Sequence, residues 1–354
     1  MKETHSVSAR RDPGFELAPD LVVVGGLTVD NVISADGRVA LAQAGGNGAY
    51  SAVGSLMWRQ RVGLVSCAVK TYPRDTITWL ETNGVDLGGV AWSSERLAAC
   101  NWFIYDKEGR REEGLASPPE ALAEAGYRTD RLTPSGIAGW RAHLANRAAP
   151  GEVSYSDFRD RHPLTPAQVP GGWRGTRGVH LAPSHPEVML AMLDHFMPAG
   201  ATVTADPGWQ LADRRLDELE PILTRLDAFL PSEVELLALL PGTGLADALG
   251  LLANRCPGAV AVKLGPRGAL VWDRALAEPV AVAPEPVDVL DPTGAGDSFC
   301  GGFLAGLVET GNPVEAARFG SISASRVVTR FGAGGALPAD RNEVRSALAT
   351  ETAP

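Results

Sequence analysis

Cysteine is scarce in this chain, and its distribution argues against two kinds of site. The 354 residues include four cysteines, and none of them has a partner at the short spacing of a metal-binding motif: Cys67, Cys100, Cys256 and Cys300. A disulfide framework is typical of small secreted domains, which this chain does not resemble. We therefore expect free, buried thiols and a cytoplasmic protein.

Long apolar runs and an excess of basic charge are also missing. No stretch approaches the roughly 18 apolar residues of a membrane-spanning helix, and residues 1–20 lack the apolar core of a signal peptide. We expect residues 1–18 to be a disordered leader. Asp and Glu number 42 against 32 Lys and Arg, a formal net charge of −10. Nucleic acids and anionic membranes favour basic surfaces, so neither is expected as a partner.

Short apolar runs alternate with amphipathic segments along most of the chain. Bounded by glycine, proline or polar residues, such runs favour buried strands over helices; they lie at 21–26, 62–66, 178–182, 202–206, 227–230, 259–263 and 269–272. Helical periodicity occurs between them, as at 186–196 and 232–240. This alternation predicts an α/β fold with a mostly parallel sheet covered on both faces. Ligands of such sheets bind at the carboxyl ends of the strands.

Two segments interrupt the alternation and predict a small second sheet. Residues 27–46 and 101–114 alternate like exposed antiparallel strands, with ADGR and DKEGR as their hairpin turns. We expect inserted segments at about 27–46 and 97–116 to form a lid over an edge of the main sheet. An exposed lid edge also predicts pairing into a homodimer. The segment 115–178 is rich in Pro, Arg, Gly and Trp and allows no ordered prediction.

The stretch DPTGAGDSFCGGF, residues 291–303, predicts a helix that begins at an anion-binding turn. Apolar residues after Asp297 recur at helical spacing, so Gly294, Ala295 and Gly296 lie where the helix begins. The first amides of a helix have no internal partner and carry partial positive charge. Glycine allows a ligand to approach them closely, so the turn can bind a phosphate without a lysine.

Asp297 stands at the mouth of this turn, where the helix dipole favours its ionised form. The simpler interpretation is a glycine turn with Asp297 as a helix-starting residue and no ligand. An acid beside an anion site is better explained by phosphoryl transfer to a hydroxyl. The amides would stabilise the transferred group, and Asp297 would accept the hydroxyl proton late in the reaction.

The same stretch resembles the C-terminal signature of the ribokinase-like (PfkB) carbohydrate kinases. GGNGAYSAVG at 45–54 resembles the N-terminal signature of that family, with VKLGPRGAL at 262–270 between the two and FGAGGALP at 331–338 after them. Several motifs in the right order are far more specific than one glycine-rich loop. The resemblance covers about residues 20–340 and predicts a kinase domain at 19–345. It implies a doubly wound sheet of about eight or nine strands with a β lid, and a reaction that uses ATP and Mg²⁺.

The resemblance also implies roles for single residues. Asp297 matches the general base, and the anion hole matches Gly294, Ala295 and Gly296. Acceptor contacts are implied at Asp30, Gly45, Gly46, Asn47 and Tyr50. Nucleotide contacts are implied at Lys263, Gly265, Gly268, Thr293 and Gly332. Magnesium is linked to Glu235 and Ser232, and a potassium ion, held in some members, to Asp291 and Thr293.

Three departures from the family pattern concern the metal and the acceptor. Ser232 stands where the family's Asn-x-x-Glu motif has asparagine, although Glu235 is kept. A hydroxyl offers one donor where an amide offers two, and Glu235 could alternatively serve only to begin the helix at 232–240. Tyr50 stands where asparagine is usual, and KTYP at 70–73 replaces an expected Gly-Asp turn. The catalytic motif is therefore intact, whereas the acceptor side is altered.

Three classes of function remain compatible with the sequence. The first is an ATP-dependent kinase of a sugar or sugar-like alcohol, with a nucleoside kinase as the alternative. The second is a binding protein that has lost catalysis; Ser232 and Tyr50 allow it, but the intact GAGD disfavours it. The third is a dehydrogenase, which would need a G-x-G-x-x-G after the first strand that this chain lacks.

The acceptor itself is open among ribose, fructose, another ketose, a nucleoside and a sugar phosphate. A buried Asp30 could accept hydrogen bonds from two neighbouring hydroxyls, and its charge would repel a nearby phosphate. The flat ring of Tyr50 would suit the apolar face of a sugar or a base. We predict a neutral polyhydroxylated acceptor. Arg110 and Arg111, in the lid, are expected to be solvated unless the acceptor or ATP reaches them.

Overall fold

A computed structural model describes residues 18–97, 101–113, 119–128, 151–276, 278–337 and 341–350. The leader predicted at 1–18 lies outside the described residues apart from residue 18, and so does Cys100. The three other cysteines, Cys67, Cys256 and Cys300, are free and buried, as predicted. In the described part of the chain, no helix is long and apolar enough to cross a membrane.

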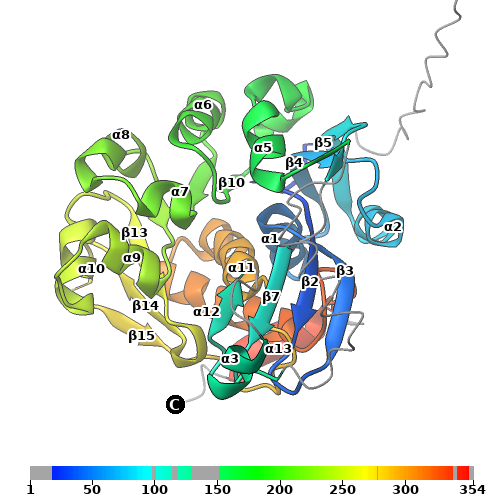
Figure 1. Cartoon of the computed structure of the whole chain (residues 1–354). Coiled ribbons are helices and arrows are strands. Elements are labelled where there is room, and N and C mark those ends of the chain that lie inside the picture. Colours follow the sequence, from blue (N-terminus) through cyan, green and yellow to red (C-terminus); the bar gives the residue numbers. More distant parts are fainter. Residues whose placement is uncertain are drawn as a thin grey trace, which may run out of the picture.

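A nine-stranded sheet in the order β15-β14-β13-β12-β11-β10-β1-β4-β5 forms the centre of the fold (Figure 1). Its strands are β1 (Leu21–Val24), β4 (Val62–Val69), β5 (Val85–Ser93), β10 (Gly178–Leu181), β11 (Thr202–Ala205), β12 (Ala228–Phe229), β13 (Ala259–Lys263), β14 (Ala269–Trp272) and β15 (Val280–Val282). Only the β13–β14 and β14–β15 pairs are antiparallel. The chain runs outward from β1 to β5 and then restarts at β10 in the other direction. This reversal creates a switch point beside β1, where ligands of such sheets bind.

The doubly wound, mostly parallel sheet predicted from the sequence is confirmed, and each predicted apolar run forms a strand. The prediction missed β5 and β15. β5 contains the pair Gly88 and Gly89 and lies at one edge of the sheet, and β15 has three residues at the other edge. Edge strands are only partly buried, so neither has the continuous apolar run that marks a central strand.

Helices cover both faces of this sheet because successive strand side chains point to opposite sides. In β1, Val22 and Val24 pack into one apolar cluster, whereas Leu21 and Val23 pack into another. The helices are α1 (Asn47–Leu56), α2 (Arg74–Thr82), α3 (Pro119–Glu124), α5 (Tyr155–Arg161), α6 (Pro186–Phe196), α7 (Gly208–Ala212), α8 (Glu220–Leu223), α9 (Glu233–Leu239), α10 (Leu245–Ala253), α11 (Ala295–Thr310), α12 (Pro313–Val327) and α13 (Asn342–Thr350). Short 3₁₀ turns lie at Pro166–Gln168, Gly171–Gly175, Met197–Ala199, Leu216–Leu219 and Gly265–Arg267.

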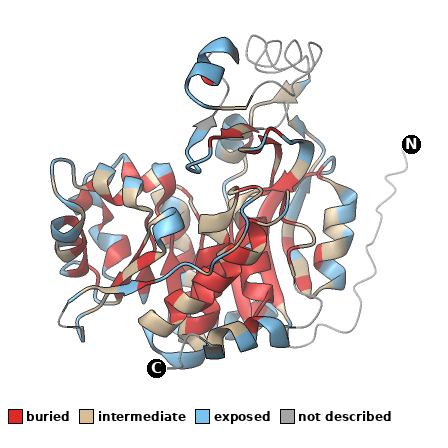
Figure 2. Ribbon diagram, turned by 90° about the horizontal axis from the view of Figure 1, so that it is seen from below, coloured by how far each residue is buried: buried red, intermediate tan, exposed pale blue. Residues whose placement is uncertain are grey.

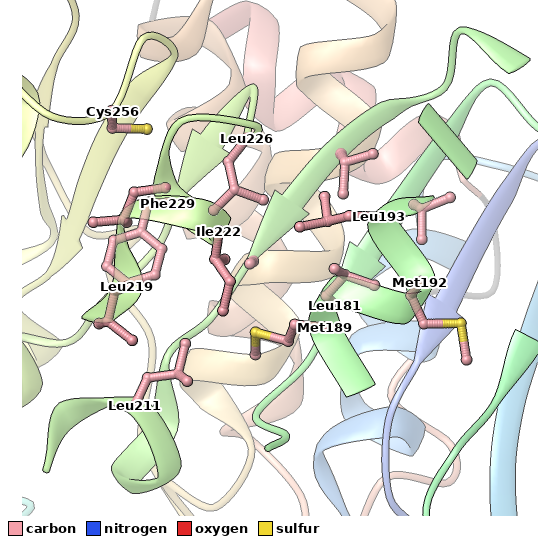
Figure 3. Packing of buried hydrophobic residues seen from close by; sticks show 14 of the residues in the cluster. Leu181, Met189, Met192, Leu193, Leu211, Leu219, Ile222, Leu226, Phe229 and Cys256 are labelled. Atoms are coloured by element: carbon pink, nitrogen blue, oxygen red, sulfur yellow. The ribbon is translucent and has the colours of Figure 1, made fainter. Parts of the chain in front are cut away.

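The larger apolar cluster joins the sheet to the helices α6 to α10. Figure 3 shows Met189, Met192 and Leu193 of α6 beside Leu181 of β10, with Ile222 of α8 and Phe229 of β12 in the same cluster. Buried residues run through the central strands and inner helices, and exposed residues lie on the outer helices (Figure 2). The core therefore fixes the strand ends, where the polar residues described below are located.

A four-stranded second sheet has the order β3-β2-β7-β8, with β2 (Thr28–Ile33), β3 (Val39–Gly45), β7 (Asn101–Tyr105) and β8 (Arg111–Glu113). Both predicted hairpins are present, since β2–β3 and β7–β8 pair antiparallel. The two hairpins join through a parallel β2–β7 pair. The sequence predicted exposed antiparallel strands, and the parallel β2–β7 pair and the burial of β2 differ from that prediction. β2 lies inside the small sheet and is almost wholly buried.

The segment 115–178, which allowed no prediction, contributes α3, α5 and a short strand, β9 (Glu152–Val153). β9 pairs with β6 (Arg96–Leu97), and α5 lies near the strand ends. Residues 129–150 of this segment lie outside the described part of the chain.

The two glycine signatures meet where α1 crosses α11, because both helices have small residues at the crossing. A Cβ on Gly301 of α11 would lie 1.9 Å from the Ser51 carbonyl oxygen, and one on Gly54 of α1 would lie 2.2 Å from the Ser298 carbonyl oxygen. Serine hydroxyls add hydrogen bonds: Ser51 Oγ donates to the Asp297 carbonyl at 3.0 Å, and Ser55 Oγ to that of Gly301 at 3.0 Å. The backbone carrying Asp297 is therefore held by the first signature helix.

Gly301→Ala should test this crossing. Alanine is the better helix former by roughly 1 kcal/mol, but its Cβ would push two backbones apart, so we expect a net loss of about 1–3 kcal/mol in unfolding free energy. Urea unfolding would measure it. Gly172→Ala is the matched control, because a Cβ there has no neighbour within 4 Å. Equal unfolding midpoints for the two variants would contradict the role of the crossing.

Candidate active site

The predicted glycine turn forms the N-terminus of α11. Gly294 is the N-cap residue, with a φ of 77° in the left-handed region that favours glycine. The Ala295 amide donates to the Pro292 carbonyl at 3.1 Å. The role of Ala295 in an anion hole stays a prediction. The amides of Gly296 and Asp297 are first-turn donors without intrahelical acceptors, so they can bind an anion at the turn beside Gly294.

Asp297 is partly buried at this N-terminus and lies among charged groups from three other elements. Burial raises the pKa of the Asp297 carboxyl. The positive charges of Lys263 and Arg111 oppose that shift, and the negative charge of Glu235 adds to it. The direction is opposite to the one expected from the helix dipole alone. A carboxylate with a raised pKa is a stronger base, which suits proton transfer near neutral pH.

A buried ion pair lies beside the cradle. The Nζ of Lys263, at the end of β13, bonds to the carboxylate of Asp206, which follows β11, and lies 3.5 Å from Cys300 Sγ. A Cβ on Gly296 would lie 3.6 Å from that Nζ. Burial disfavours the charged lysine, but Asp206, with further contributions from Cys300 and Glu235, raises the pKa of Lys263 well above its usual value. The ammonium predicted to contact the nucleotide is therefore already paired inside the protein.

Ser232 and Glu235 form a capping box at the start of α9. The Ser232 amide donates to Glu235 Oε2 at 2.7 Å, and the Glu235 amide donates to Ser232 Oγ at 3.3 Å. Burial raises the pKa of the Glu235 carboxyl, and the charge of Asp206 adds to this shift. The helix-start role is thus present, and it uses the Ser232 hydroxyl and one carboxylate oxygen.

The turn between β13 and β14 contains Gly265 and Gly268. A Cβ on Gly265 would have no neighbour within 4 Å, so this side of the turn is open. A Cβ on Gly268 would lie 2.1 Å from the Val282 carbonyl oxygen, so Gly268 allows β15 to pack closely. Of these two predicted nucleotide contacts, Gly265 faces open space and Gly268 serves the packing of the sheet edge.

Asp30 and the glycines of the first signature lie together where the lid joins the main sheet. Asp30 is 2% exposed and accepts a hydrogen bond from Thr28 Oγ1 at 3.1 Å. A Cβ on Gly45 would lie 1.7 Å from Asp30 Oδ2, and one on Gly46 would lie 2.4 Å from the Gly26 carbonyl oxygen. The predicted acceptor residues Asp30, Gly45 and Gly46 are therefore brought together.

Asn47 and Tyr50 both make structural contacts beside the site. Asn47 Oδ1 accepts from the Gly26 amide at 2.6 Å, and its Nδ2 donates to the Pro183 carbonyl at 3.2 Å. These bonds link the loops after β1 and β10 at the switch point. The Tyr50 side chain is 2% exposed, and a Cβ on Gly294 would lie 2.2 Å from its ring. The ring therefore supports the glycine turn, and acceptor contacts of Asn47 and Tyr50 stay predictions.

The unusual KTYP turn supports the same loop. Tyr72 is buried, and its phenol donates to the Gly45 carbonyl at 3.1 Å. Burial, with a contribution from the charge of Asp30, raises the pKa of this phenol and keeps it a hydrogen-bond donor. Tyr72 therefore holds the Gly45 backbone in place. It does so from the KTYP turn, which stands where a Gly-Asp turn was expected.

Asp291, Thr293 and Gly332 gather at the junction of α11 with the small sheet. Asp291 Oδ1 accepts from the Thr293 amide at 2.9 Å and from the backbone of Gly332, whereas Oδ2 is buried and has no partner among the described residues. Burial raises the pKa of the Asp291 carboxyl. Thr293 Oγ1 lies 2.8 Å from the Tyr105 phenol oxygen, and a Cβ on Gly332 would lie 3.3 Å from Gln43 Oε1. Thr293 and Gly332 therefore sit at the lid junction.

A cavity of about 40 Å³ lies between α5 and the ends of β1, β4 and β10, lined in part by Cys67, Phe158 and His185. The Tyr155 phenol reaches into this region, since a Cβ on Gly26 would lie 1.9 Å from its oxygen. Burial raises the pKa of Tyr155 to about 12, opposed by Arg159 and assisted by Asp30. Gly26 lines the cavity, and its amide donates to Asn47 Oδ1 of the first signature, so the cavity adjoins the predicted acceptor residues.

Carboxylates are abundant here, although no three His, Cys, Asp or Glu side chains of the described residues come together as a ready-made metal site. Magnesium is commonly bound by one or two carboxylates, waters and substrate phosphates, so it needs no such cluster. Asp206, Glu235 and Asp297 lie around Lys263, and Arg111 is a second cation near Asp297, so acids outnumber bases among these described residues. The unpartnered Asp291 oxygen fits a monovalent cation.

Sequence reasoning missed four residues of the site: Asp206, Tyr72, Tyr105 and Tyr155. Asp206 had a usable signal, because it ends the apolar run at 202–206 at the carboxyl edge of the sheet. The tyrosines had none, since their contacts join segments far apart in the chain.

Comparisons with known proteins agree with the fold described above. Residues 176–340 match the family model described as pfkB family carbohydrate kinase. A cytidine kinase of Thermococcus kodakarensis is 26% identical over 317 residues, which cover 88% of this chain and 97% of that protein. A nucleoside kinase structure from Methanocaldococcus jannaschii, described as an archaeal member of the ribokinase family, superposes with a TM-score of 0.64 at 20% identity and covers 94% of this chain and 99% of that one. A putative ribokinase II from E. coli in complex with ATP and Mg²⁺ gives 0.61 at 17% identity, with coverage of 94% and 99%.

Lys263→Gln should show how much the fold depends on the buried pair. Asp206 would remain buried without its cation, so we expect a loss of about 3–5 kcal/mol in unfolding free energy, measured by urea titration. Arg267→Gln removes a cation from an exposed pair with Glu233 and should cost less than about 1 kcal/mol. Comparable losses in the two variants would contradict the importance of the buried pair.

Proposed function

We propose that this chain is a carbohydrate kinase of the pfkB family, which the match of residues 176–340 supports, and that it transfers the γ-phosphoryl group of ATP to a hydroxyl of a sugar or nucleoside, with Asp297 as the general base. One observation carries the assignment: a carboxyl whose pKa is raised by burial lies at the N-terminus of α11, beside first-turn amides that can bind an anion.

The proposed reaction needs a group that accepts the hydroxyl proton and a site that stabilises the transferred phosphoryl group. The acceptor hydroxyl attacks the γ-phosphorus while the bond from that phosphorus to the bridging oxygen of ADP breaks. Asp297 accepts the hydroxyl proton as charge moves to the phosphoryl oxygens. The amides of Gly296 and Asp297 stabilise those oxygens. Lys263 limits the accumulation of negative charge beside the cradle, where three carboxyls lie close together.

Magnesium fits the acidic side of this site. Glu235, and Ser232 through a water, are the proposed ligands, and the ion would neutralise phosphate charge when bound. Asp291 is proposed to hold a potassium ion beside Thr293, because its buried Oδ2 has no partner among the described residues. The open side of Gly265 is the proposed path of the nucleotide.

The acceptor is proposed to bind between Asp30 and α5. Asp30 is buried, and its carboxylate lies against Gly45. An acceptor hydroxyl would therefore have to reach the carboxylate directly, past the Gly45 backbone. The adjoining cavity under α5 has a volume of only about 40 Å³, so a larger acceptor would have to displace its lining side chains. The cytidine kinase relative favours a nucleoside among neutral acceptors.

The exposed edge of the small sheet supports a proposed homodimer. β3 is the terminal strand of that sheet, and its Val39 and Leu41 are 37% and 56% exposed. Pairing of two β3 edges would cover both side chains and the unpaired backbone. The free thiols of Cys67, Cys256 and Cys300 support a reducing cytoplasmic location.

Asp297→Asn should lower kcat by about 10²–10⁴ while leaving ATP binding nearly unchanged, because the amide keeps the shape but accepts no proton. Wild-type activity should fall as the pH drops through the raised pKa of Asp297, since only the ionised form is a base. Steady-state kinetics over a pH series, together with ATP titration, would measure both effects. Near-normal turnover of the variant would refute the base assignment.

Asp30→Ala should abolish acceptor binding and leave ATP binding intact, because acceptor hydroxyls would lose their buried partner. We expect the wild type to prefer free sugars and nucleosides to their monophosphates. A coupled ADP-release assay over matched pairs would measure the preference. A clear preference for the monophosphates would overturn the neutral-acceptor prediction.

A further inference from the structure

The two neighbouring arginines of the β7–β8 hairpin are held in different ways. Arg110 belongs to the hairpin turn: its backbone amide and its Nε donate to the Asp106 carboxylate at 2.8 and 2.5 Å. Arg111 lies one residue further, in β8, opposite Tyr105 of β7. Its guanidinium carbon is 4.9 Å from the centroid of the Phe103 ring. The Asp106 contacts therefore hold Arg110 in the turn, whereas the guanidinium of Arg111 lies over the Phe103 ring.

The contacts of Arg111 lead to the reaction centre. Its side chain hydrogen-bonds the Tyr105 phenol, which in turn lies 2.8 Å from Thr293 Oγ1 in the glycine turn of α11. Asp297 responds to the positive charge of Arg111, which lowers the pKa of that carboxyl against the effect of burial. Arg111 is thus the lid cation whose charge reaches the proposed base, although its side chain is exposed.

The charge balance of the site shows what an arginine can add there. The nearby acids are Asp206, Glu235 and Asp297, and the one buried cation, Lys263, is already bonded to Asp206. A phosphoryl group in transfer carries negative charge on three oxygens. A planar guanidinium can donate two hydrogen bonds to such a group, in a geometry that lysine cannot reproduce.

We propose that Arg111 binds the γ-phosphoryl group of ATP from the lid side, opposite the amides of α11, and stabilises it during transfer. This inference rests on the proposed kinase function. The bond from the acceptor oxygen to the γ-phosphorus forms, the bond to the bridging oxygen of ADP breaks, and the proton passes to Asp297. Arg111 keeps its proton throughout and contributes only hydrogen bonds and charge.

The test compares Arg111→Gln, Arg111→Lys and the matched control Arg110→Gln. We expect Arg111→Gln to lower kcat/KM for ATP by about 10²–10³, the loss typical of one donor to a transition-state oxyanion. Arg111→Lys should recover part of that loss, and Arg110→Gln should stay within about twofold of the wild type. Because Arg111 is exposed, all three variants should fold normally, which thermal unfolding would verify.

Binding measurements make the test independent of turnover. Arg111→Gln should weaken binding of the non-hydrolysable analogue AMP-PNP, in the presence of Mg²⁺, and leave ADP binding unchanged, because ADP lacks the γ-phosphoryl group. Equal losses for both nucleotides, or Arg111→Gln behaving like Arg110→Gln, would overturn the proposal. A loss confined to the KM of the acceptor would also overturn it and assign Arg111 to an anionic acceptor.

If the wild type phosphorylates no sugar or nucleoside, the kinase function fails, and the AMP-PNP and ADP affinities still decide the role of Arg111.

Discussion

The close crossing of α1 and α11 is the constraint on which the site depends. Gly54 and Gly301 allow the two backbones to approach within a distance that excludes any side chain. Ser51 and Ser298 then link them through hydroxyl bonds to backbone carbonyls. As a result, the loop that carries the acceptor residues and the turn that carries Asp297 belong to one packed unit. Catalysis needs this precision, since small displacements of reacting groups are costly.

Around this crossing, the protein gathers more negative charge than a core usually contains. Asp206, Glu235 and Asp297 come from the ends of β11, the start of α9 and the start of α11, and Lys263 partly balances them. Burial raises the pKa of Glu235 and of Asp297. The arrangement is costly without a cation, which is consistent with a site that receives Mg²⁺ together with a nucleotide.

The small sheet is connected to the reaction centre through polar contacts. Tyr105 joins it to Thr293, and the Ala333 amide donates to the Ala44 carbonyl at 3.0 Å. Asp291, with its unpartnered oxygen, lies at the same junction. Any ion bound there would influence the lid and the N-terminus of α11 together. A few hydrogen bonds therefore link the small sheet to the N-terminus of α11.

The sequence by itself determined the central strands of the sheet and the glycine turn at the start of α11. Apolar runs mark the central strands because these are buried on both faces, and the GAGD motif marks a helix start through local backbone chemistry. Tertiary structure decided what Tyr50, Asn47 and Lys263 do. Their partners, Gly294, Pro183 and Asp206, are distant in the chain, and no local pattern shows which polar group a neighbour will satisfy. The parallel joining of the two lid hairpins was decided in the same way, because hairpin turns specify only local, antiparallel pairing.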